Sequence, residues 1–374
     1  MAPDDKMTRV LMTADAVGGV WTYATELCRN LASRGIEVTL AVLGPPPSAD
    51  QRAEIAALPQ VSLHCRPCKL EWMADPWDDV AGAGEWLLGL ESKVAPDVVH
   101  LNGYCHGACR WQAPSVVVGH SCVLSWWQAV RGEPAPPEWA PYGDAVRRGL
   151  QSADVVVAPS AGMLTELERF YGPLPRARVI VNGRSRTDIT QRKEPLVLTA
   201  GRLWDAATNI AAVSAVAGTI AWPIAVAGAT AEDQSGESSA AGLDRIRYLG
   251  RLSGDEVRRW MGRASIYVMP ACYEPFGLSV LEAALAGCAL VLGDIPTLRE
   301  IWGDAAIYVD PHERDALRRA LNALIDDSGR RQTLATAAFR RAATLTPQRM
   351  TDEYCALYQE LIRERRAVLS LSAV

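Results

Sequence analysis

The architecture of this chain can be worked out from EPFGLSVLEA, residues 274–283. An apolar, strand-like run, SIYVMPA (265–271), comes shortly before it, and an apolar periodic segment continues after it to Ala286-Gly287. This order predicts a strand, a glycine turn and the N-terminus of a helix. A helix N-terminus presents unpaired N–H groups and the positive end of the helix dipole, so the turn is suited to binding a phosphate.

Two carboxylates bracket this predicted phosphate site. Glu274 lies in the turn and Glu282 in the helix, with seven residues between them. Eight helical steps span roughly 12 Å, about the length of a sugar diphosphate joined to a ribose. We therefore expect one carboxylate to bind the sugar and the other the ribose, with the amides of Phe276, Gly277 and Leu278 facing the diphosphate. The plainer interpretation is a chance pair on a solvated helix face, but a position at the carboxyl end of a strand favours a ligand site.

Short runs rich in valine and isoleucine recur along the chain in two series. Seven runs extend from RVLMTA (9–14) to RVIV (178–181), and six from PLVLTA (195–200) to AIYV (306–309). Runs of this kind, separated by helix-like segments, are typical of parallel sheets covered on both faces. The sequence predicts an α/β protein with two Rossmann-like domains and an interdomain cleft.

The predicted domain boundary falls in the polar stretch GRSRTDITQRKEP (183–195). We assign residues 1–186 to the first domain and residues 187–346 to the second. The remaining residues, 347–374, contain an amphipathic helical pattern that follows the last strand.

Composition excludes several classes of protein. The 374 residues carry a formal net charge of −5, without the broad basic footprint of a nucleic-acid binder. No apolar run reaches the length of a membrane span, and MAPDDKMTRV at the start is unlike a signal peptide. Nine cysteines then read as reduced thiols of a cytoplasmic protein. The basic run Arg363, Arg365 and Arg366 is typical of a solvated helix face and leaves a peripheral membrane contact open.

The 274–283 segment resembles the E-x7-E signature of retaining glycosyltransferases of the GT-B fold, specifically glycosyltransferase family 4. GRLWDAATN (201–209) and IPTLREIWGDAAIYVDP (295–311) resemble the same family, and the resemblance covers nearly the whole chain. It implies the GT-B arrangement, in which residues 1–186 form an acceptor-side domain and residues 187–346 a domain that binds the nucleotide sugar. The last helix is then expected to cross back onto the first domain. It also implies transfer of a sugar from a nucleotide diphosphate sugar to an acceptor hydroxyl with retention of configuration, without a metal ion or any other cofactor.

Arg202 follows the first strand of the second domain, where arginine suits bidentate contact with phosphate. The resemblance implies that this arginine and a lysine six residues later neutralise the leaving diphosphate. The lysine position holds Thr208, a loss that typically costs a few kcal/mol of transition-state stabilisation. Lys193 and Arg251 are candidates to replace the missing charge, and a solvated surface arginine is the plainer interpretation of Arg202.

On the first-domain side, Gly18 and Gly19 precede a helix and allow close approach of a phosphate or sugar. An ordinary glycine turn explains them equally well, but the resemblance implies a donor-side loop. A lone histidine such as His120 is more often structural, whereas the resemblance implies that it lies beside the transferred sugar. Asn102, at the end of the preceding strand, is expected to face the same cleft.

Trp126 and Trp127 are the candidates for binding the acceptor, because sugars stack on aromatic faces; core or interface packing is the alternative. No metal is expected. The Cys65–Cys68 pair and the cluster around His106 each lack a second half with the spacing of a zinc site.

Two rival functions remain at the level of sequence. One is a phosphorylase or sugar-nucleotide epimerase on the same fold, which dependence on inorganic phosphate or turnover without an acceptor would reveal. The other is a catalytically weak protein that binds sugar nucleotides and tolerates Thr208.

Overall fold

The computed structural model describes residues 8–186, 191–228 and 246–372. The chain divides into two compact units. The first unit comprises the chain up to Ser125, then Pro134–Gly183 and the segment from Pro347 onward. The second unit comprises Trp126–Glu133 and Arg184–Thr346.

A seven-stranded sheet forms the centre of the first unit. All neighbouring strands are parallel, in the order β3-β2-β1-β4-β5-β6-β7. The strands are β1 (Arg9–Asp15), β2 (Glu37–Leu43), β3 (Val61–Arg66), β4 (Val98–Leu101), β5 (Ser115–Val118), β6 (Val155–Ala158) and β7 (Ala177–Val179). Each coincides with one of the seven apolar runs, so the prediction of a parallel sheet is confirmed.

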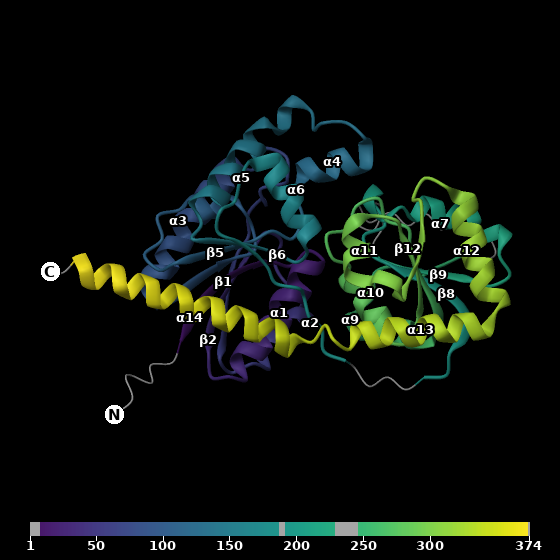
Figure 1. Ribbon diagram of the computed structural model, residues 1–374. Helices are drawn as coiled ribbons and strands as arrows, with labels where there is room; N and C mark the ends of the chain where they lie inside the picture. The colour runs from purple at the N-terminus through teal and green to yellow at the C-terminus, as the bar shows by residue number, and fades with distance from the viewer. Residues whose placement is uncertain (1–7, 187–190, 229–245, 373–374) are drawn as a thin grey trace. The chain divides into compact units, whose positions relative to one another are not determined.

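Helices cover both faces of this sheet, with α3, α5 and α6 on one face and α1 and α14 on the other (Figure 1). The helices are α1 (Gly19–Ala32), α2 (Ala49–Ala56), α3 (Trp77–Val94), α4 (Val123–Arg131), α5 (Ala140–Ser152), α6 (Ala161–Tyr171) and α14 (Pro347–Ser372). Two short 3-10 turns are η1 (Cys105–Ala108) and η2 (Pro137–Trp139). Most of α4, from Trp126 onward, groups with the second unit.

The long helix α14 packs against α1 through one apolar stripe. Its buried residues recur at helical spacing and are Met350, Tyr354, Leu357, Tyr358 and Leu361. Ion pairs at its margins join Arg34 to Asp352 at 2.8 Å and Arg176 to Glu364 at 2.8 Å. The last segment of the chain is therefore an integral part of the first unit.

The second unit is built on a six-stranded parallel sheet in the order β10-β9-β8-β11-β12-β13. The strands are β8 (Glu194–Ala200), β9 (Ile224–Ala227), β10 (Ile246–Tyr248), β11 (Ala264–Met269), β12 (Ala289–Gly293) and β13 (Ile307–Val309). They coincide with the second series of apolar runs. The two-sheet α/β architecture expected from the sequence is thus confirmed.

The helices of the second unit also lie on both sides of its sheet, with α7 and α12 opposite α9, α10 and α13 (Figure 1). They are α7 (Ile210–Val216), α9 (Gly254–Arg263), α10 (Leu278–Leu285), α11 (Pro296–Trp302), α12 (Arg314–Asp326) and α13 (Ser328–Ala342). The 3-10 turns are η3 (Ala206–Thr208), η4 (Ala217–Thr219) and η5 (Gly303–Ala305).

Both sheets reverse their strand order beside the first strand of the unit, between β1 and β4 and between β8 and β11. In open α/β sheets, ligands bind outside the carboxyl ends of the strands at such a switch point. Gly18 and Asn102 follow β1 and β4, while Arg202 and Glu274 follow β8 and β11. The topology of each unit therefore brings its own predicted site residues to the edge where ligands bind.

Within residues 8–186, 191–228 and 246–372, no helix combines the length and the apolar character needed to cross a bilayer.

Candidate active site

The turn between β11 and α10 is organised by the carboxylate of Glu274. Its Oε1 accepts hydrogen bonds from the amides of Gly277 at 2.8 Å and Phe276 at 3.3 Å. Glu274 thus provides a hydrogen-bond acceptor for the two amides that directly precede Leu278, the first residue of α10. Thr297 fixes the backbone by donating to the Glu274 carbonyl at 2.6 Å, a contact that the sequence did not reveal.

Gly277 is required by the geometry of this turn. Its φ of 88° lies in the left-handed region, and a Cβ there would lie 3.1 Å from the Val280 side chain. The glycine therefore allows the chain to turn sharply from β11 into α10 and to point successive amides at one carboxylate.

Burial dominates the electrostatics of Glu274. It raises the pKa of this carboxyl above its ordinary value, while the amides of Phe276 and Gly277 and the Arg202 guanidinium act in the opposite direction. A hydroxyl-rich ligand that approached Glu274 would meet a half-buried acceptor already aligned with a helix N-terminus.

Arg202 lies in the neighbouring turn, after β8, and is held by Asp205. Its Nη2 lies 3.0 Å from Asp205 Oδ2, and its guanidinium stacks 5.4 Å from the centroid of the Trp204 ring. The Arg202 side chain is 47% exposed, which leaves much of its donor fork accessible. The backbone amide of Cys272 donates to the Ala207 carbonyl at 2.9 Å, so the two turns are joined directly.

Asp205 is a functional candidate that sequence reasoning missed. It is 6% exposed, and its Oδ1 accepts from the amide of Ala207 and from Trp126 Nε1, each at 2.9 Å. An aspartate directly before a short helical turn is a recognisable N-cap, which was the available signal. Its role in this geometry is to orient Arg202.

Thr208 does not present its hydroxyl to a ligand. The hydroxyl donates to the carbonyls of Asp205 at 2.8 Å and Arg202 at 3.2 Å, within its own turn. Lys193 donates to the carbonyls of Met261 at 2.9 Å and Ala264 at 2.7 Å, which occupies its ammonium group.

Arg251 is exposed beyond the edge strand β10, two strand positions from β8. Among the contacts of the residues that the structure covers, neither Lys193 nor Arg251 bonds to Arg202 or Glu274. Lys193 precedes β8 and Arg202 follows it, so Lys193 lies at the other end of that strand. Arg251 stays a prediction for the charge that is missing at position 208.

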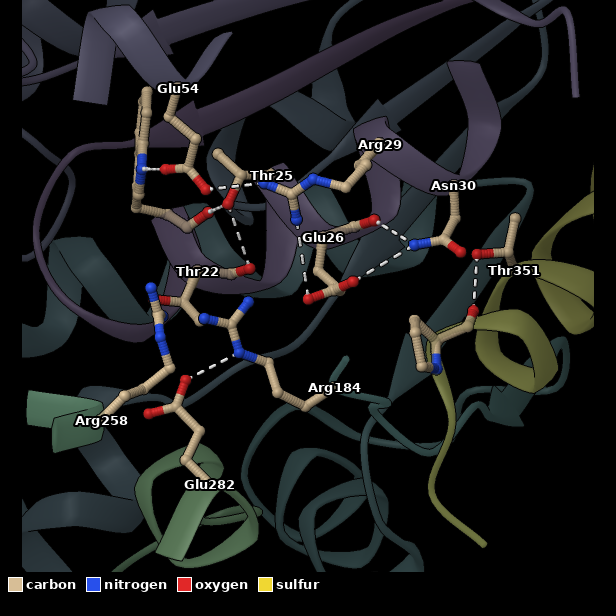
Figure 2. Close-up of polar contacts among 12 residues, drawn as sticks. Thr22, Thr25, Glu26, Arg29, Asn30, Glu54, Arg184, Arg258, Glu282 and Thr351 are labelled. Atoms are coloured by element: carbon tan, nitrogen blue, oxygen red, sulfur yellow. Dashed lines mark hydrogen bonds and ion pairs between the residues drawn. The ribbon is translucent and has the colours of Figure 1, made fainter. Parts of the chain in front are cut away.

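Glu282, the second carboxylate of the motif, forms a largely buried ion pair with Arg184. Glu282 Oε1 lies 2.7 Å from Arg184 Nε, and the side chains are 16% and 12% exposed respectively. Figure 2 shows Arg258 beside this pair, and all three residues line one small pocket. Arg184 lies 98 residues before Glu282 in the sequence, so spacing could not have revealed the contact.

In the first unit, His120 is held by Asn102. His120 Nε2 lies 2.8 Å from Asn102 Oδ1, and Asn102 Nδ2 donates to the Thr13 carbonyl at 2.7 Å. The Asn102 backbone amide also donates to Thr13 Oγ1 at 2.8 Å. Burial lowers the pKa of His120 to about 4, so the ring is neutral near pH 7. Thr13 was another contributor that the sequence did not indicate.

Gly18 and Gly19 begin α1, as the glycine-turn pattern predicts. Gly18 is the N-cap, with a φ of 82°, and Gly19 is the first helical residue. Trp126 and Trp127 lie on α4, with ring centroids 5.7 Å apart in an edge-on arrangement. The guanidinium of Arg131 lies 5.8 and 5.9 Å from their ring centroids.

In the part of the chain that the structure covers, His, Cys, Asp and Glu side chains form no group of three that could bind a metal ion. All nine cysteines are free thiols.

Comparison with known proteins identifies the class to which these two units belong. Residues 17–186 match the model of Glycosyltransferase Family 4, and residues 194–327 match that of Glycosyl transferases group 1. The sucrose-phosphate synthase of Thermosynechococcus elongatus covers 96% of this chain and is itself covered completely, with a TM-score of 0.75 and 17% identity. The Anabaena protein HepE in complex with UDP-glucose covers 94%, with 99% of that chain covered, a TM-score of 0.72 and 15% identity. At these identities the structures establish the fold.

The chain belongs to the glycosyltransferases of the GT-B fold. The D-inositol 3-phosphate glycosyltransferase of Salinispora tropica is 32% identical over 136 residues, 36% of this chain and 28% of that protein. The O-antigen chain mannosyltransferase B of Escherichia coli is 39% identical over 93 residues, 25% of this chain and 24% of that protein. These matches span about a quarter of each relative. A longer match, at 25% identity, covers 89% of this chain and 88% of the D-inositol 3-phosphate glycosyltransferase of Xylanimonas cellulosilytica.

Proposed function

We propose that this protein is a retaining glycosyltransferase that moves a sugar from a nucleotide diphosphate sugar to an acceptor hydroxyl. The observation that supports this most directly is the arrangement at the switch point of the second sheet. There, the Glu274 carboxylate accepts from an amide at the N-terminus of α10. The turn after β8, which is hydrogen-bonded to the turn after β11, carries the exposed Arg202. The UDP-glucose complex of the structurally similar HepE favours a uridine nucleotide as the donor.

In this proposal, the bound donor replaces the hydrogen bonds that Glu274 makes with the amides of Phe276 and Gly277. Hydroxyls of the donor sugar donate to Glu274, and the diphosphate takes the amides of Phe276, Gly277 and Leu278 at the positive end of α10. Arg202, oriented by Asp205, neutralises the charge that develops on the leaving diphosphate. Arginine and the helix N-terminus supply this stabilisation without a metal ion or other cofactor.

Glu282 binds the ribose hydroxyls in the same scheme. Its Oε1 is held by Arg184, and its second oxygen is the acceptor for the ribose. Pairing with Arg184 fixes the orientation of this carboxylate, which leaves its second oxygen directed at a ribose hydroxyl.

Retention follows from attack on the face that the diphosphate leaves. The bond between the anomeric carbon and the phosphate oxygen breaks, and the acceptor oxygen bonds to the same face of that carbon. The acceptor proton passes to the departing phosphate oxygen. Neutral His120 lies beside the donor sugar, and Trp126 and Trp127 contact the acceptor.

The first test is a thermal-shift screen of UDP, GDP and ADP sugars, since a bound ligand raises stability with the logarithm of its excess over Kd. We expect a UDP sugar to give the largest shift. Glu274→Ala and Arg202→Ala should each lower the transfer rate by about 100-fold or more. Asp326→Ala, which removes an exposed carboxylate at the end of α12, is the matched control.

The stereochemistry of the product tests the mechanism separately. Proton NMR of the first product formed should show the anomeric configuration of the donor. An inverted product, or unchanged rates in both Glu274→Ala and Arg202→Ala, would overturn the proposal. A requirement for inorganic phosphate would instead indicate a phosphorylase.

Thr208 favours one alternative, a protein that binds sugar nucleotides and transfers sugar slowly or not at all. Its hydroxyl is bonded within its own turn and adds no positive charge to the site. Binding of a nucleotide sugar without transfer, with transfer appearing in Thr208→Lys, would establish that alternative.

A further inference from the structure

A second histidine, His100 on β4, connects helix α14 to the residues that hold His120. His100 is fully buried, and its Nδ1 lies 2.6 Å from the hydroxyl of Tyr358 on α14. On its other side, His100 Nε2 lies 3.3 Å from Asn102 Oδ1. Asn102 Oδ1 is also the atom that contacts His120 Nε2, at 2.8 Å. One amide oxygen is therefore shared by two imidazole rings.

The orientation of the Asn102 amide can be assigned from its other end. Its Nδ2 donates to the Thr13 carbonyl at 2.7 Å, and because a carbonyl oxygen can only accept, the amide must present its NH2 group there. Oδ1 must then face the two histidines, and this oxygen can only accept. It follows that His120 carries its proton on Nε2, which leaves the lone pair on Nδ1.

The same oxygen selects the protonation state of His100. A proton on Nε2 makes the 3.3 Å contact with Asn102 Oδ1 attractive, whereas a lone pair there would face the oxygen lone pairs. Tyr23 also lies 3.3 Å from this nitrogen and acts as a second acceptor in the favoured state. His100 Nδ1 is then an acceptor, and the Tyr358 hydroxyl donates to it.

We propose that Tyr358 is a positioning residue for His120. By donating to His100 Nδ1, it holds the His100 proton on Nε2, which keeps Asn102 Oδ1 in place for His120. The outcome is a neutral His120 whose Nδ1 accepts a hydrogen bond from a hydroxyl of the donor sugar. This last step rests on the proposed function, whereas the relay from Tyr358 to His120 does not.

Alpha-helix α14 supplies a closely matched control. Tyr354 lies one turn before Tyr358, is fully buried, and packs on the His100 ring with centroids 5.1 Å apart. In the described contacts, its hydroxyl makes no hydrogen bond to His100. Tyr354→Phe and Tyr358→Phe thus remove the same atom from the same face of the same helix, and only Tyr358→Phe removes the bond to His100.

The relay can be tested without substrate by long-range proton–nitrogen NMR of protein labelled with nitrogen-15 in its five histidines. His100→Gln and His120→Asn assign the two rings. We expect both rings to be protonated on Nε2 in the unaltered protein. Tyr358→Phe should shift the Nδ1 signal of His100 and the Nε2 signal of His120, and Tyr354→Phe should shift neither. A wild-type His100 protonated on Nδ1, or a His120 spectrum unaffected by Tyr358→Phe, would overturn the relay.

Transfer kinetics test the link to function. We expect Tyr358→Phe to lower kcat/KM for the donor by about fivefold, the effect of one weakened hydrogen bond, while Tyr354→Phe stays within about twofold of the unaltered protein. Equal rates in both variants despite a shifted His120 spectrum would overturn the sugar contact alone. If no donor is turned over by the unaltered protein, the proposed function fails and the NMR result still decides the relay.

Discussion

At the scale of single residues, the carboxylates of this site are engaged by the protein itself. Glu274 accepts from two amides, Glu282 is paired with Arg184, and Asp205 is paired with Arg202. The proposed binding of a nucleotide sugar would therefore exchange hydrogen-bond partners, and only the difference in hydrogen-bond strength would contribute to affinity. The groups that gain most are those whose present partners are weakest or most exposed, and Arg202 is the most exposed of them.

Thr208→Lys tests whether charge at the leaving group limits the rate. We expect the transfer rate to rise about tenfold or more, because a cation is restored where negative charge develops. The loss of two hydrogen bonds within the turn should lower the free energy of unfolding by about 1 kcal/mol. Thr208→Val, which removes the hydroxyl without adding charge, should show that loss alone. A rate for Thr208→Lys no higher than for Thr208→Val would mean that another cation already serves the diphosphate.

The buried histidines make the stability of the first unit depend on pH. Burial lowers the pKa of His100 to about 3 and that of His120 to about 4, against an ordinary value of about 6.5 in the unfolded chain. Below about pH 6.5 these histidines become protonated in the unfolded chain but stay neutral in the folded unit. The free energy of unfolding therefore falls as the pH is lowered toward 4. We expect each histidine to lower the free energy of unfolding by about 3 kcal/mol between pH 6.5 and pH 4.

Urea unfolding at a series of pH values, monitored by hydrogen exchange of first-unit amides, measures this decrease in the free energy of unfolding. His100→Asn should flatten the dependence between pH 6.5 and 4, and His312→Asn, at an exposed position, should not. If the free energy of unfolding depended on pH equally in the two variants, protonation of His100 would not contribute to that dependence.

At the scale of elements, α10 is the part of the second unit on which the proposed binding of the donor depends. Both of its ends are glycines with positive φ, 88° at Gly277 and 79° at Gly287. Gly277→Ala and Gly287→Ala should each lower the free energy of unfolding by about 1 kcal/mol or more, through backbone strain. A Cβ at Gly287 meets only Lys193 at an ordinary 3.6 Å, and it lies at the end of the helix away from Glu274.

Calorimetric titration with the donor distinguishes the two ends. We expect Gly277→Ala to weaken donor binding by about tenfold, since it displaces the amides that Glu274 and the diphosphate use, and Gly287→Ala to leave binding unchanged. Equal affinities in the two variants would remove the N-terminus of α10 from the binding site.

The elements were also the part of the structure that the sequence predicted best. Parallel strands buried on both faces must be apolar throughout, so each strand stands out as a valine- and isoleucine-rich run. The strand ends then located Arg202 and Glu274 together. Contacts such as Glu282 with Arg184, or Asn102 with Thr13, depend on how distant segments pack and leave no periodic signal. The direction of a side chain, as at Thr208, is equally hidden.

At the scale of the whole molecule, the first unit is assembled from separated parts of the chain, and α14 is the most distant of them. Leu357 on α14 is 1% exposed, whereas Leu369 on the same helix is 57% exposed. We expect Leu357→Ala to lower the free energy of unfolding of the first unit by about 2–4 kcal/mol, and Leu369→Ala to change it by less than about 0.5. Denaturant unfolding monitored by first-unit amides would measure both, and a small effect of Leu357→Ala would mean that α14 contributes little.

The place of α14 in the first unit also imposes an order on biosynthesis. Domains generally fold from the N-terminus as the chain emerges, at about 5–20 residues per second. Helix α14 follows the α1 residues that it covers by some 300 residues, so it is made on the order of 15–60 s after them. The second unit has its complete sequence once Thr346 has been added, before any of α14 has been made. Until α14 has been made, the apolar face of α1 that it covers has no partner in the nascent chain. A ribosome-associated chaperone would have this surface to protect during that time.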